Sequence, residues 1–255
     1  MRVLHAALVM QWHLSVRELQ NIILVVAVPL LGAALAGIVL HAGRADLLPN
    51  ALVAPTLVTT GHLSFFVASE LIASERFSET LELTVAAPAP FTVLLLARVL
   101  VITGVGVFGF VETWLTIGLI AGSLVPIYHP LVLTATLLLA TVAAASTAMI
   151  TTGLFALRRQ TRMFQNAVNY PLYVLSGVLV PVTILPVWLQ PFSKVVFLYW
   201  AADLMRDSMR PEPVQDALLR MGAIVVLALL AGLLGATILR RMLDRQRQNG
   251  TLALT

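Results

Sequence analysis

The chain has 255 residues, of which 59% are hydrophobic and only 11% are charged. A soluble domain carries about a quarter charged residues, so this composition excludes an ordinary soluble globular protein. Apolar stretches of about 20 residues recur along the chain, which indicates a helical protein that crosses a membrane several times. The net charge of +4 does not favour nucleic-acid binding, because the arginines flank the apolar stretches. The absence of cysteine excludes disulfides and thiolate metal sites.

Residues 1–21 predict an amphipathic helix at the membrane surface. Leu4, Leu8 and Trp12 share one face at helical spacing, whereas Arg2 and Arg17 lie on the opposite face. Such a segment tends to lie in the interface with its apolar face in lipid. The alternative is a soluble extension of the first spanning helix. The segment does not have the apolar core of a secretory signal peptide.

The apolar stretches predict six transmembrane helices in one all-α membrane domain, residues 1–255. The spans cover residues 22–40, 52–72, 91–120, 131–157, 167–185 and 218–239, and residues 240–255 form a tail. With both termini in the cytoplasm, eleven basic residues fall on the inner side and five on the outer side. The positive-inside rule therefore favours this orientation in the cell membrane.

The polar segment between the second and third spans predicts a cytoplasmic helix over residues 74–88. In "SERFSETLELTVAAPAP", Glu75, Glu79 and Glu82 share one helix face and Phe77 and Leu81 the other. Acidic residues early in a helix suit its dipole, and the two prolines stop it. The alternative is a solvated loop. Three like charges on one stripe favour a helix whose carboxylates bind a complementary partner.

The segment between the fifth and sixth spans predicts a broken, re-entrant helical element over residues 186–210. Pro181, Pro186 and Pro191 prevent one continuous helix, and aromatic residues such as Trp188 and Tyr199 make the segment too apolar for an ordinary loop. Such an element is tolerated at membrane depth where it packs on protein or lines a wet cavity. The alternative is an interfacial anchor. Acidic residues match its basic residues in number: Asp203, Asp207, Glu212 and Asp216.

These two segments together resemble the permeases of type-2 ABC exporters (ABC-2 type). In the segment between the second and third spans, the family commonly has an acidic–basic pair, then a Gly-Thr-hydrophobic-Glu core, then a proline. This sequence has Glu79 where the family usually has the glycine. The residues that match are Glu75, Arg76, Thr80, Leu81, Glu82 and Pro88. In "LSGVLVPVTILPVWL" and "FLYWAADLMR" the matching residues are Gly177, Pro181, Pro186, Trp188, Asp203 and Arg206.

The resemblance implies a permease subunit that dimerises and exports a substrate with energy from ATP. The helix of residues 74–88 would be a coupling helix docking on a separate ABC ATPase, through Glu75, Arg76, Phe77, Glu79, Thr80, Leu81 and Glu82. The re-entrant element would form an outer gate, with the residues Gly177, Pro181, Pro186, Trp188, Tyr199, Asp203 and Arg206. The sequence lacks a GxxxxGK[ST] loop, so ATP and magnesium are expected on the partner and no cofactor on this chain. Its second partner would be another permease copy or a homologous permease.

Two ionisable residues within the spans are candidates for the translocation pathway. His62 lies midway along the second span, and Glu112 lies in the outer part of the third. Ionisable groups at membrane depth are costly and often functional, although each could instead be hydrogen-bonded within the bundle. Arg158, Arg159 and Arg162 are explained by orientation and anionic lipid, or by a second contact with the ATPase. The histidines have no metal-ligand spacing, so no metal is expected.

Two other functions remain as alternatives. A secondary transporter driven by an ion gradient usually shows an internal repeat, which this sequence lacks. An intramembrane enzyme would need a catalytic constellation at membrane depth, and none assembles from the sequence. The mostly apolar spans favour an amphipathic, drug-like or lipid-linked cargo.

Overall fold

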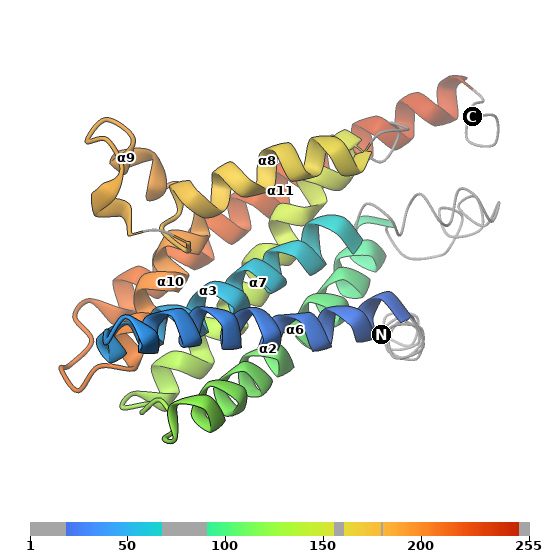
Figure 1. Cartoon of the computed structure of the whole chain (residues 1–255). Coiled ribbons are helices and arrows are strands. Elements are labelled where there is room, and N and C mark those ends of the chain that lie inside the picture. The colour runs from blue at the N-terminus through green and yellow to red at the C-terminus, as the bar shows by residue number, and fades with distance from the viewer. Residues whose placement is uncertain (1–18, 68–90, 156–160, 180, 250–255) are drawn as a thin grey trace.

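The computed structural model describes residues 19–67, 91–155, 161–179 and 181–249 (Figure 1). These residues form helices and connecting turns, without a strand among them. The longer helices are α2 (Leu19–His41), α3 (Leu48–His62), α6 (Phe91–Ala121), α7 (Pro130–Phe155), α8 (Thr161–Leu175), α10 (Phe197–Ser208) and α11 (Ala217–Asn249). The shorter ones are η1 (Ala45–Leu47), the π-helical η2 (Leu63–Val67), η3 (Val182–Ile184) and α9 (Gln190–Ser193).

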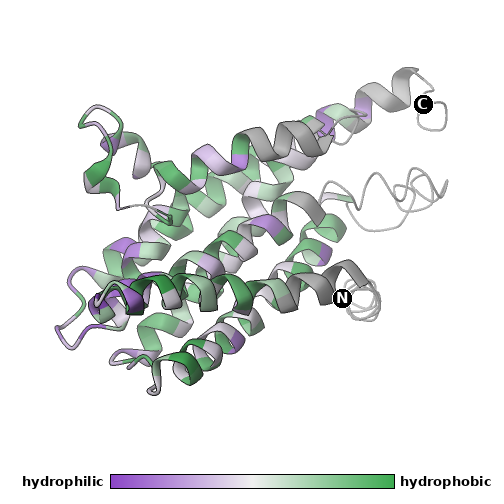
Figure 2. Ribbon diagram, in the orientation of Figure 1, coloured by the Kyte–Doolittle hydropathy of each residue, from purple (hydrophilic) through white to green (hydrophobic). Residues whose placement is uncertain are grey.

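The long helices lie side by side and carry the chain back and forth between two ends of a bundle (Figure 1). One end, here called the α10 end, holds η1, α9, α10 and residues 209–216. The opposite end, here called the terminal end, holds Leu19 and Asn249, and Val67 and Phe91 also lie there. Hydrophilic residues gather in the connections of the α10 end, whereas hydrophobic residues run along the helices (Figure 2).

The prediction of an all-helical protein with several apolar helices is confirmed. Three helices of the described chain are long and apolar enough to cross a membrane: Phe91–Ala121, Pro130–Leu154 and Ala217–Met242. Ala27–His41 is a shorter apolar helix. The second predicted span coincides with α3 and η2 up to Val67. The number of six membrane crossings stays a prediction, since length and composition mark three helices of the described chain.

Helix α8 differs from the span predicted at residues 167–185. It begins at Thr161 and ends at Leu175, because Gly177 adopts a left-handed conformation with φ of +73°. The amide of Gly177 donates to the Val174 carbonyl, and the amide of Val178 donates to the Tyr173 carbonyl. This is the Schellman arrangement that commonly closes a helix at a glycine. The apolar residues after Gly177 continue the hydrophobic pattern but not the helix.

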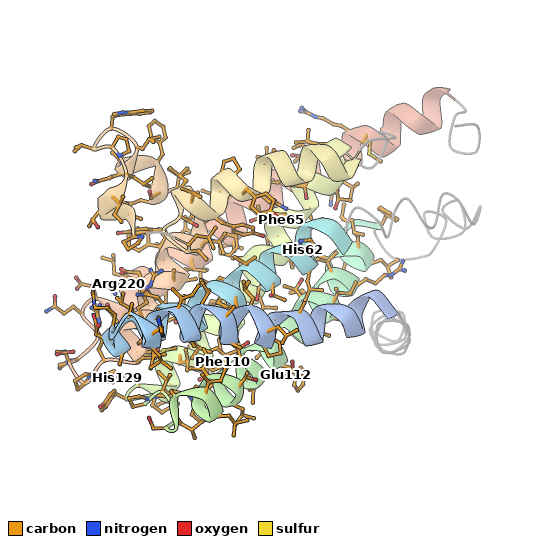
Figure 3. All side chains as sticks on the ribbon, in the orientation of Figure 1. His62, Phe65, Phe110, Glu112, His129 and Arg220 are labelled. Atoms are coloured by element: carbon orange, nitrogen blue, oxygen red, sulfur yellow. The ribbon has the colours of Figure 1, made fainter. Side chains whose placement is uncertain are left out.

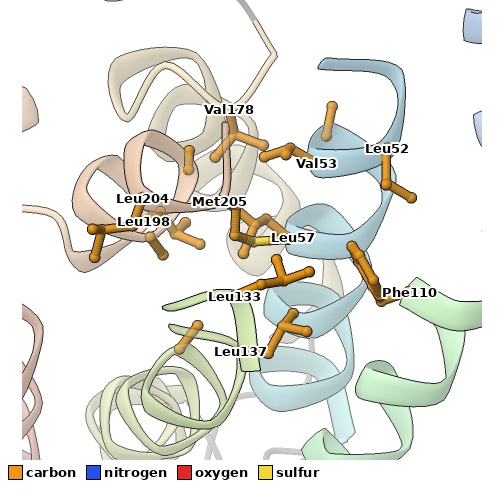
Figure 4. Packing of buried hydrophobic residues seen from close by; sticks show 14 of the residues in the cluster. Leu52, Val53, Leu57, Phe110, Leu133, Leu137, Val178, Leu198, Leu204 and Met205 are labelled. Carbon is orange, nitrogen blue, oxygen red and sulfur yellow. The ribbon is translucent and has the colours of Figure 1, made fainter. Parts of the chain in front are cut away.

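Two apolar clusters form the core of the bundle. The larger one joins α3, α7, α10 and α11 towards the α10 end, and Leu52, Leu57, Leu204 and Met205 are fully buried in it (Figure 4). The smaller one includes Phe65 of η2 and joins η2, α6, α7 and α11. Because α10 contributes its entire apolar face to the larger cluster, α10 is a built-in part of the core.

Helices α7 and α11 pack closely through small residues. A Cβ atom at Gly235 of α11 would lie 2.9 Å from the backbone nitrogen of Ile150, and one at Gly153 of α7 would meet Ile238 at 2.8 Å. Ala144 and Ala148 are fully buried on α7. Small residues allow helix backbones to approach, which is how membrane helices gain packing energy in the absence of a hydrophobic driving force.

The outward face of α11 has the opposite character. Its apolar residues are exposed over much of the helix, with Leu218 at 86%, Leu229 at 61% and Leu233 at 67% exposure. In the apolar part of α11, 22% of the residues are buried, against 50% in that of α6. A wide apolar face on a spanning helix suits contact with lipid.

Three hydroxyl groups of α3 and η2 bind carbonyls of the preceding helical turn. The hydroxyls of Thr56, Thr60 and Ser64 donate to the carbonyls of Leu52, Thr56 and Thr60, at 2.8, 2.8 and 2.9 Å. Each of these side chains is buried. Hydrogen bonding to the preceding turn lets a polar side chain lie inside a bundle without leaving an unpaired donor.

Candidate functional site

The coupling residues predicted in the segment between α3 and α6 lie outside the described residues. These are Glu75, Arg76, Phe77, Glu79, Thr80, Leu81 and Glu82. The N-terminal amphipathic helix predicted at residues 1–21 also lies mostly outside them, since α2 begins at Leu19. The candidate site that the structure describes is therefore at the α10 end.

Helix α10 is amphipathic and seated in the bundle by its apolar face. Phe197, Leu198, Ala201, Ala202, Leu204, Met205 and Ser208 are buried at helical spacing. The opposite face carries Tyr199, Asp203, Arg206 and Asp207. Extended backbone at Val196 (φ −98°, ψ 124°) precedes the helix, and the Trp200 indole donates to the Lys194 carbonyl at 2.9 Å. The broken helical form that the prolines predict is thus present over the described residues.

Arg206 connects α10 to two other parts of the chain. Its Nε donates to the Asn50 side-chain oxygen of α3 at 2.6 Å. Its Nη2 donates to the Gly177 carbonyl at 2.6 Å and to the Val178 carbonyl at 3.4 Å. None of the ion pairs in the described part of the chain includes Arg206. Burial lowers the pKa of Arg206, and the negative charge of Asp203 partly opposes this shift. The hydrogen-bond partners of Arg206 are neutral oxygen atoms.

Arg220 at the start of α11 is held by carboxylates instead. It lies 2.6 Å from Asp207 and 3.5 Å from Asp203, both on α10. Arg210 approaches the other oxygen of Asp207 at 3.4 Å. Burial raises the pKa of Asp203, and the charge of Arg220 partly opposes this shift. The ion pairs fasten α10 to α11 at the α10 end (Figure 3).

A third set of hydrogen bonds joins α10 to the connection before α7. The amides of Tyr128 and His129 both donate to the Ser208 carbonyl, at 3.1 and 3.0 Å. The His129 ring lies 2.9 Å from the Glu212 carbonyl. These bonds satisfy the last turn of α10, where helix carbonyls lack partners of their own. The apolar face of α10 is therefore packed in the core, and hydrogen bonds and ion pairs around it connect α10 to α3, α8, α7 and α11.

A polar hollow of about 350 Å³ opens beside this network. It is lined by Asp207, Arg210, Glu212, Pro213, Gln215 and Arg220. Because its acidic and basic residues balance, and Asp207 already binds both arginines, the hollow has no excess charge to select an ion.

The seven residues predicted for the outer element separate into two groups. Gly177, Asp203 and Arg206 belong to the network around α10, and Tyr199 stacks edge-on against Trp200 at 5.2 Å. Pro181, Pro186 and Trp188 lie in the segment of η3 and α9, where Trp188 is 69% exposed. Apolar neighbours of Trp188 are exposed as well: Ile184, Val187, Phe192 and Val195. The single predicted element is thus one buried helix and one exposed apolar segment.

The two candidate pathway residues lie apart. His62 is the last residue of α3, and Glu112 lies on α6. Both residues are labelled in Figure 3, at separate places in the bundle. His62 is half-buried. The Oε2 atom of Glu112 is buried and finds no hydrogen-bond partner within the described part of the chain. The structure does not bring these two residues into one site.

Sequence reasoning missed several residues of the network. Asn50 sits at the start of α3 beside Pro49, and no spacing rule connects it to a residue 156 positions later. The spacing of Asp203 and Asp207, one turn apart on α10, could have indicated that both face one cation, which is Arg220 in the structure.

A bundle of long apolar helices, fitted at one end with a buried amphipathic helix, defines a multi-pass membrane protein. The model of the ABC-2 type transporter family matches residues 3–209, and the chain belongs to this family. Members of this family are membrane subunits of ABC transporters, and they generally work with an ABC ATPase.

Among curated proteins, the chain is similar to nodulation protein J from three bacteria. It is 31% identical to that of Rhizobium leguminosarum bv. viciae over 103 residues, which are 40% of each chain. It is 32% identical to the proteins of R. leguminosarum bv. trifolii and Neorhizobium galegae over 103 residues, 40% of this chain and 39% of each relative. The match therefore spans about two fifths of the length of these relatives.

Proposed function

We propose that the chain is the permease subunit of an ATP-driven ABC exporter and that two permease chains together form the translocation pathway. The observation that carries this proposal is the family match over residues 3–209, combined with the place of Val67 and Phe91. Both lie at the terminal end of the bundle, so the acidic segment between them starts and finishes at that end. A coupling element must lie at the end where the ATPase binds.

The charges of the two ends support a cytoplasmic terminal end. Arg98, Arg240 and Arg241 lie on the terminal halves of α6 and α11. At the α10 end, by contrast, Arg44, Arg210 and Arg220 are each paired with an aspartate. Since an excess of basic residues marks the cytoplasmic side, the α10 end faces outwards in this proposal.

In the proposed mechanism residues 74–88 form the coupling helix. Glu75, Glu79 and Glu82 contact basic groups of the ATPase, and Phe77 and Leu81 rest on the bundle. Moving the permease between two conformations, from a population ratio of 1:99 to 99:1, takes about 5.5 kcal/mol of differential interaction. A rigid helix can pass this change on to the bundle as a rigid-body movement. ATP and magnesium bind to the partner. The apolar spans favour an amphipathic, drug-like or lipid-linked cargo.

The experiment that tests the proposal replaces Glu75, Glu79 and Glu82 together with alanine. An exposed ion pair contributes about 0.5 kcal/mol, so the loss of three should weaken binding of the ATPase by about tenfold. The measurement is co-purification of an ABC ATPase, identified by its GxxxxGK[ST] loop, together with ATP-dependent uptake of cargo into inverted vesicles.

Glu212→Ala is the matched control, because this carboxylate is exposed at the opposite end. It should leave co-purification and export unchanged. Normal recruitment of the ATPase by the triple variant would contradict the coupling role. Export that follows an ion gradient, and needs no ATPase, would instead support the secondary transporter.

A further inference from the structure

Arg206 holds together three parts of the chain that are far apart in sequence. Asn50 begins α3, Gly177 closes α8, and Arg206 itself lies in the last turns of α10. Its two shortest hydrogen bonds are both 2.6 Å long. A guanidinium presents donors in a fixed planar fork, so it can bind two acceptors only while these keep their relative positions. The contact therefore reports, and enforces, one arrangement of α3, α8 and α10.

The acceptors on the α8 side are carbonyls of the turn that closes the helix. Gly177 and Val178 follow the last residue of α8, where the negative end of the helix dipole lies. A cation at this place stabilises the end of the helix and its left-handed closure. Away from it α8 is exposed on Tyr170 and Val174 and contacts α3 through Tyr173, whose hydroxyl lies over Gly61. The Arg206 contact thus fixes an end of α8 that has an exposed outer face.

The chemistry of Arg206 differs from that of Arg220 in a way that matters for movement. Arg220 is bound by the carboxylates of Asp207 and Asp203, which fasten α10 to α11. Arg206 is bound by neutral oxygens, and bonds between a charged and a neutral group are weaker than those between two charged groups. If the helices separate at the α10 end, the contact of Arg206 with α8 and α3 breaks more readily than the contact of Arg220 with α10.

We propose that Arg206, Asn50 and the Gly177 carbonyl form a latch that keeps the α10 end of the permease closed. Release of the latch separates α10 from α8 and α3, while α10 stays fastened to α11. Cargo leaves on this side when the latch is open. The role in cargo exit rests on the proposed export function, whereas the closing of α8 onto α10 does not.

The latch can be tested with one cysteine, because the natural chain contains none. Val53 is fully buried in the apolar cluster that also holds Val178 and Met205, between the elements that the latch joins (Figure 4). The Val53→Cys chain, in unsealed membranes without nucleotide, is treated with a membrane-impermeant maleimide. The rate of labelling measures how often α8 and α10 separate, whichever side of the membrane the α10 end faces.

Two substitutions should change this rate in opposite directions. Arg206→Lys keeps the charge but loses the planar fork, and should raise the rate about tenfold. Asn50→Asp offers a carboxylate to the same Nε and should lower the rate about tenfold. A merely misfolded protein would label faster in both variants, so the opposite signs separate the latch from loss of structure.

Arg210→Lys is the matched control on the same side of the bundle, since Arg210 is 64% exposed and pairs with Asp207 at the surface. It should leave the labelling rate of the Val53→Cys chain unchanged. Labelling of a separate Gln215→Cys chain should be the same in every background, because Gln215 is exposed. Equal rates for all variants, or faster labelling in both latch variants, would overturn the proposal. Opposite shifts in a chain that recruits no ATPase would support the latch and contradict the proposed function.

Discussion

Arg206 and Arg220 are two cations at the α10 end of the bundle, and both lie close to the apolar core. Burying a charge costs several kcal/mol unless hydrogen bonds replace the lost water. Arg220 recovers this cost from carboxylates, and Arg206 from an amide oxygen and the free carbonyls at the end of α8. The second solution uses backbone carbonyls of the turn that follows α8.

We predict that Asp207→Asn destabilises the folded chain by about 1–3 kcal/mol, because it leaves Arg220 without its closest carboxylate. The pair is largely shielded, with 19% exposure of the Arg220 side chain and 22% of Asp207. The measurement is the free energy of unfolding, or the shift in melting temperature, of the purified protein in detergent.

Asp46→Asn provides the comparison, since Asp46 binds Arg44 at the same end with side chains that are 61% and 59% exposed. Water screens an exposed pair, so this variant should unfold almost as the natural protein does. Equal losses of stability in the two variants would show that shielding does not decide the strength of these pairs.

At the residue scale, the sequence shows that acidic and basic residues after residue 190 match in number but not which of them pair. In the structure Arg210 and Arg220 bind aspartate. Arg206 does not, because its neighbours are carbonyls exposed by the end of α8. A backbone acceptor has no letter in the sequence, so charge counting cannot find it.

At the element scale, helices with clear ends were predicted well. The third predicted span, residues 91–120, agrees with α6 (Phe91–Ala121), because Pro90 precedes it and Gly122 follows it. The fifth was displaced, since the apolar residues around Gly177 continue beyond the point where the helix closes. Hydrophobicity therefore located the apolar segment, whereas a left-handed glycine decided where its helix ends.

We predict that Gly235→Ala destabilises the packing of α11 on α7 by about 1–3 kcal/mol, the usual cost of an added carbon in a filled core. The new Cβ would lie 2.7 Å from the Met149 Cβ and 2.9 Å from the Ile150 backbone nitrogen. A backbone atom cannot move aside as the tip of a side chain can, so the two helices must separate. Thermal unfolding in detergent would measure the loss.

The matched control is Gly104→Ala on α6, where no atom lies within 4 Å of the new Cβ. Alanine favours a helix over glycine by about 1 kcal/mol, so this variant should be as stable as the natural chain or more so. A stabilising effect of both substitutions would mean that α7 and α11 are not in close contact.

At the scale of the whole molecule, the two ends of the bundle differ in how their charges are arranged. At the α10 end Arg44, Arg210 and Arg220 bind aspartates and Arg206 binds carbonyls, whereas the sequence at the terminal end carries arginines in excess. The overall class and the expected orientation of the chain follow from hydropathy and charge alone. The division of the outer segment into a seated helix and an exposed apolar segment does not, because it depends on which residues α10 meets in three dimensions.

We predict that a single cysteine at Gln215 reacts with an impermeant maleimide added to intact cells, because the α10 end faces outwards in the proposed orientation. A cysteine at Asp244, exposed near the end of α11, should react only after the cells are permeabilised. The natural chain, which lacks cysteine, gives the background. The reverse pattern of labelling would invert the proposed orientation and place the coupling segment on the wrong side for an ATPase.

The outward face of α11 has a consequence for how the sequence can drift over time. Its leucines and valines are largely exposed, so neighbouring side chains of the described bundle constrain their shapes little. Selection on this face therefore acts on the hydrophobicity of the side chains rather than on their shape. A substitution among aliphatic residues on that face should pass unnoticed, whereas Gly235, one residue beyond its exposed stripe, admits almost no replacement.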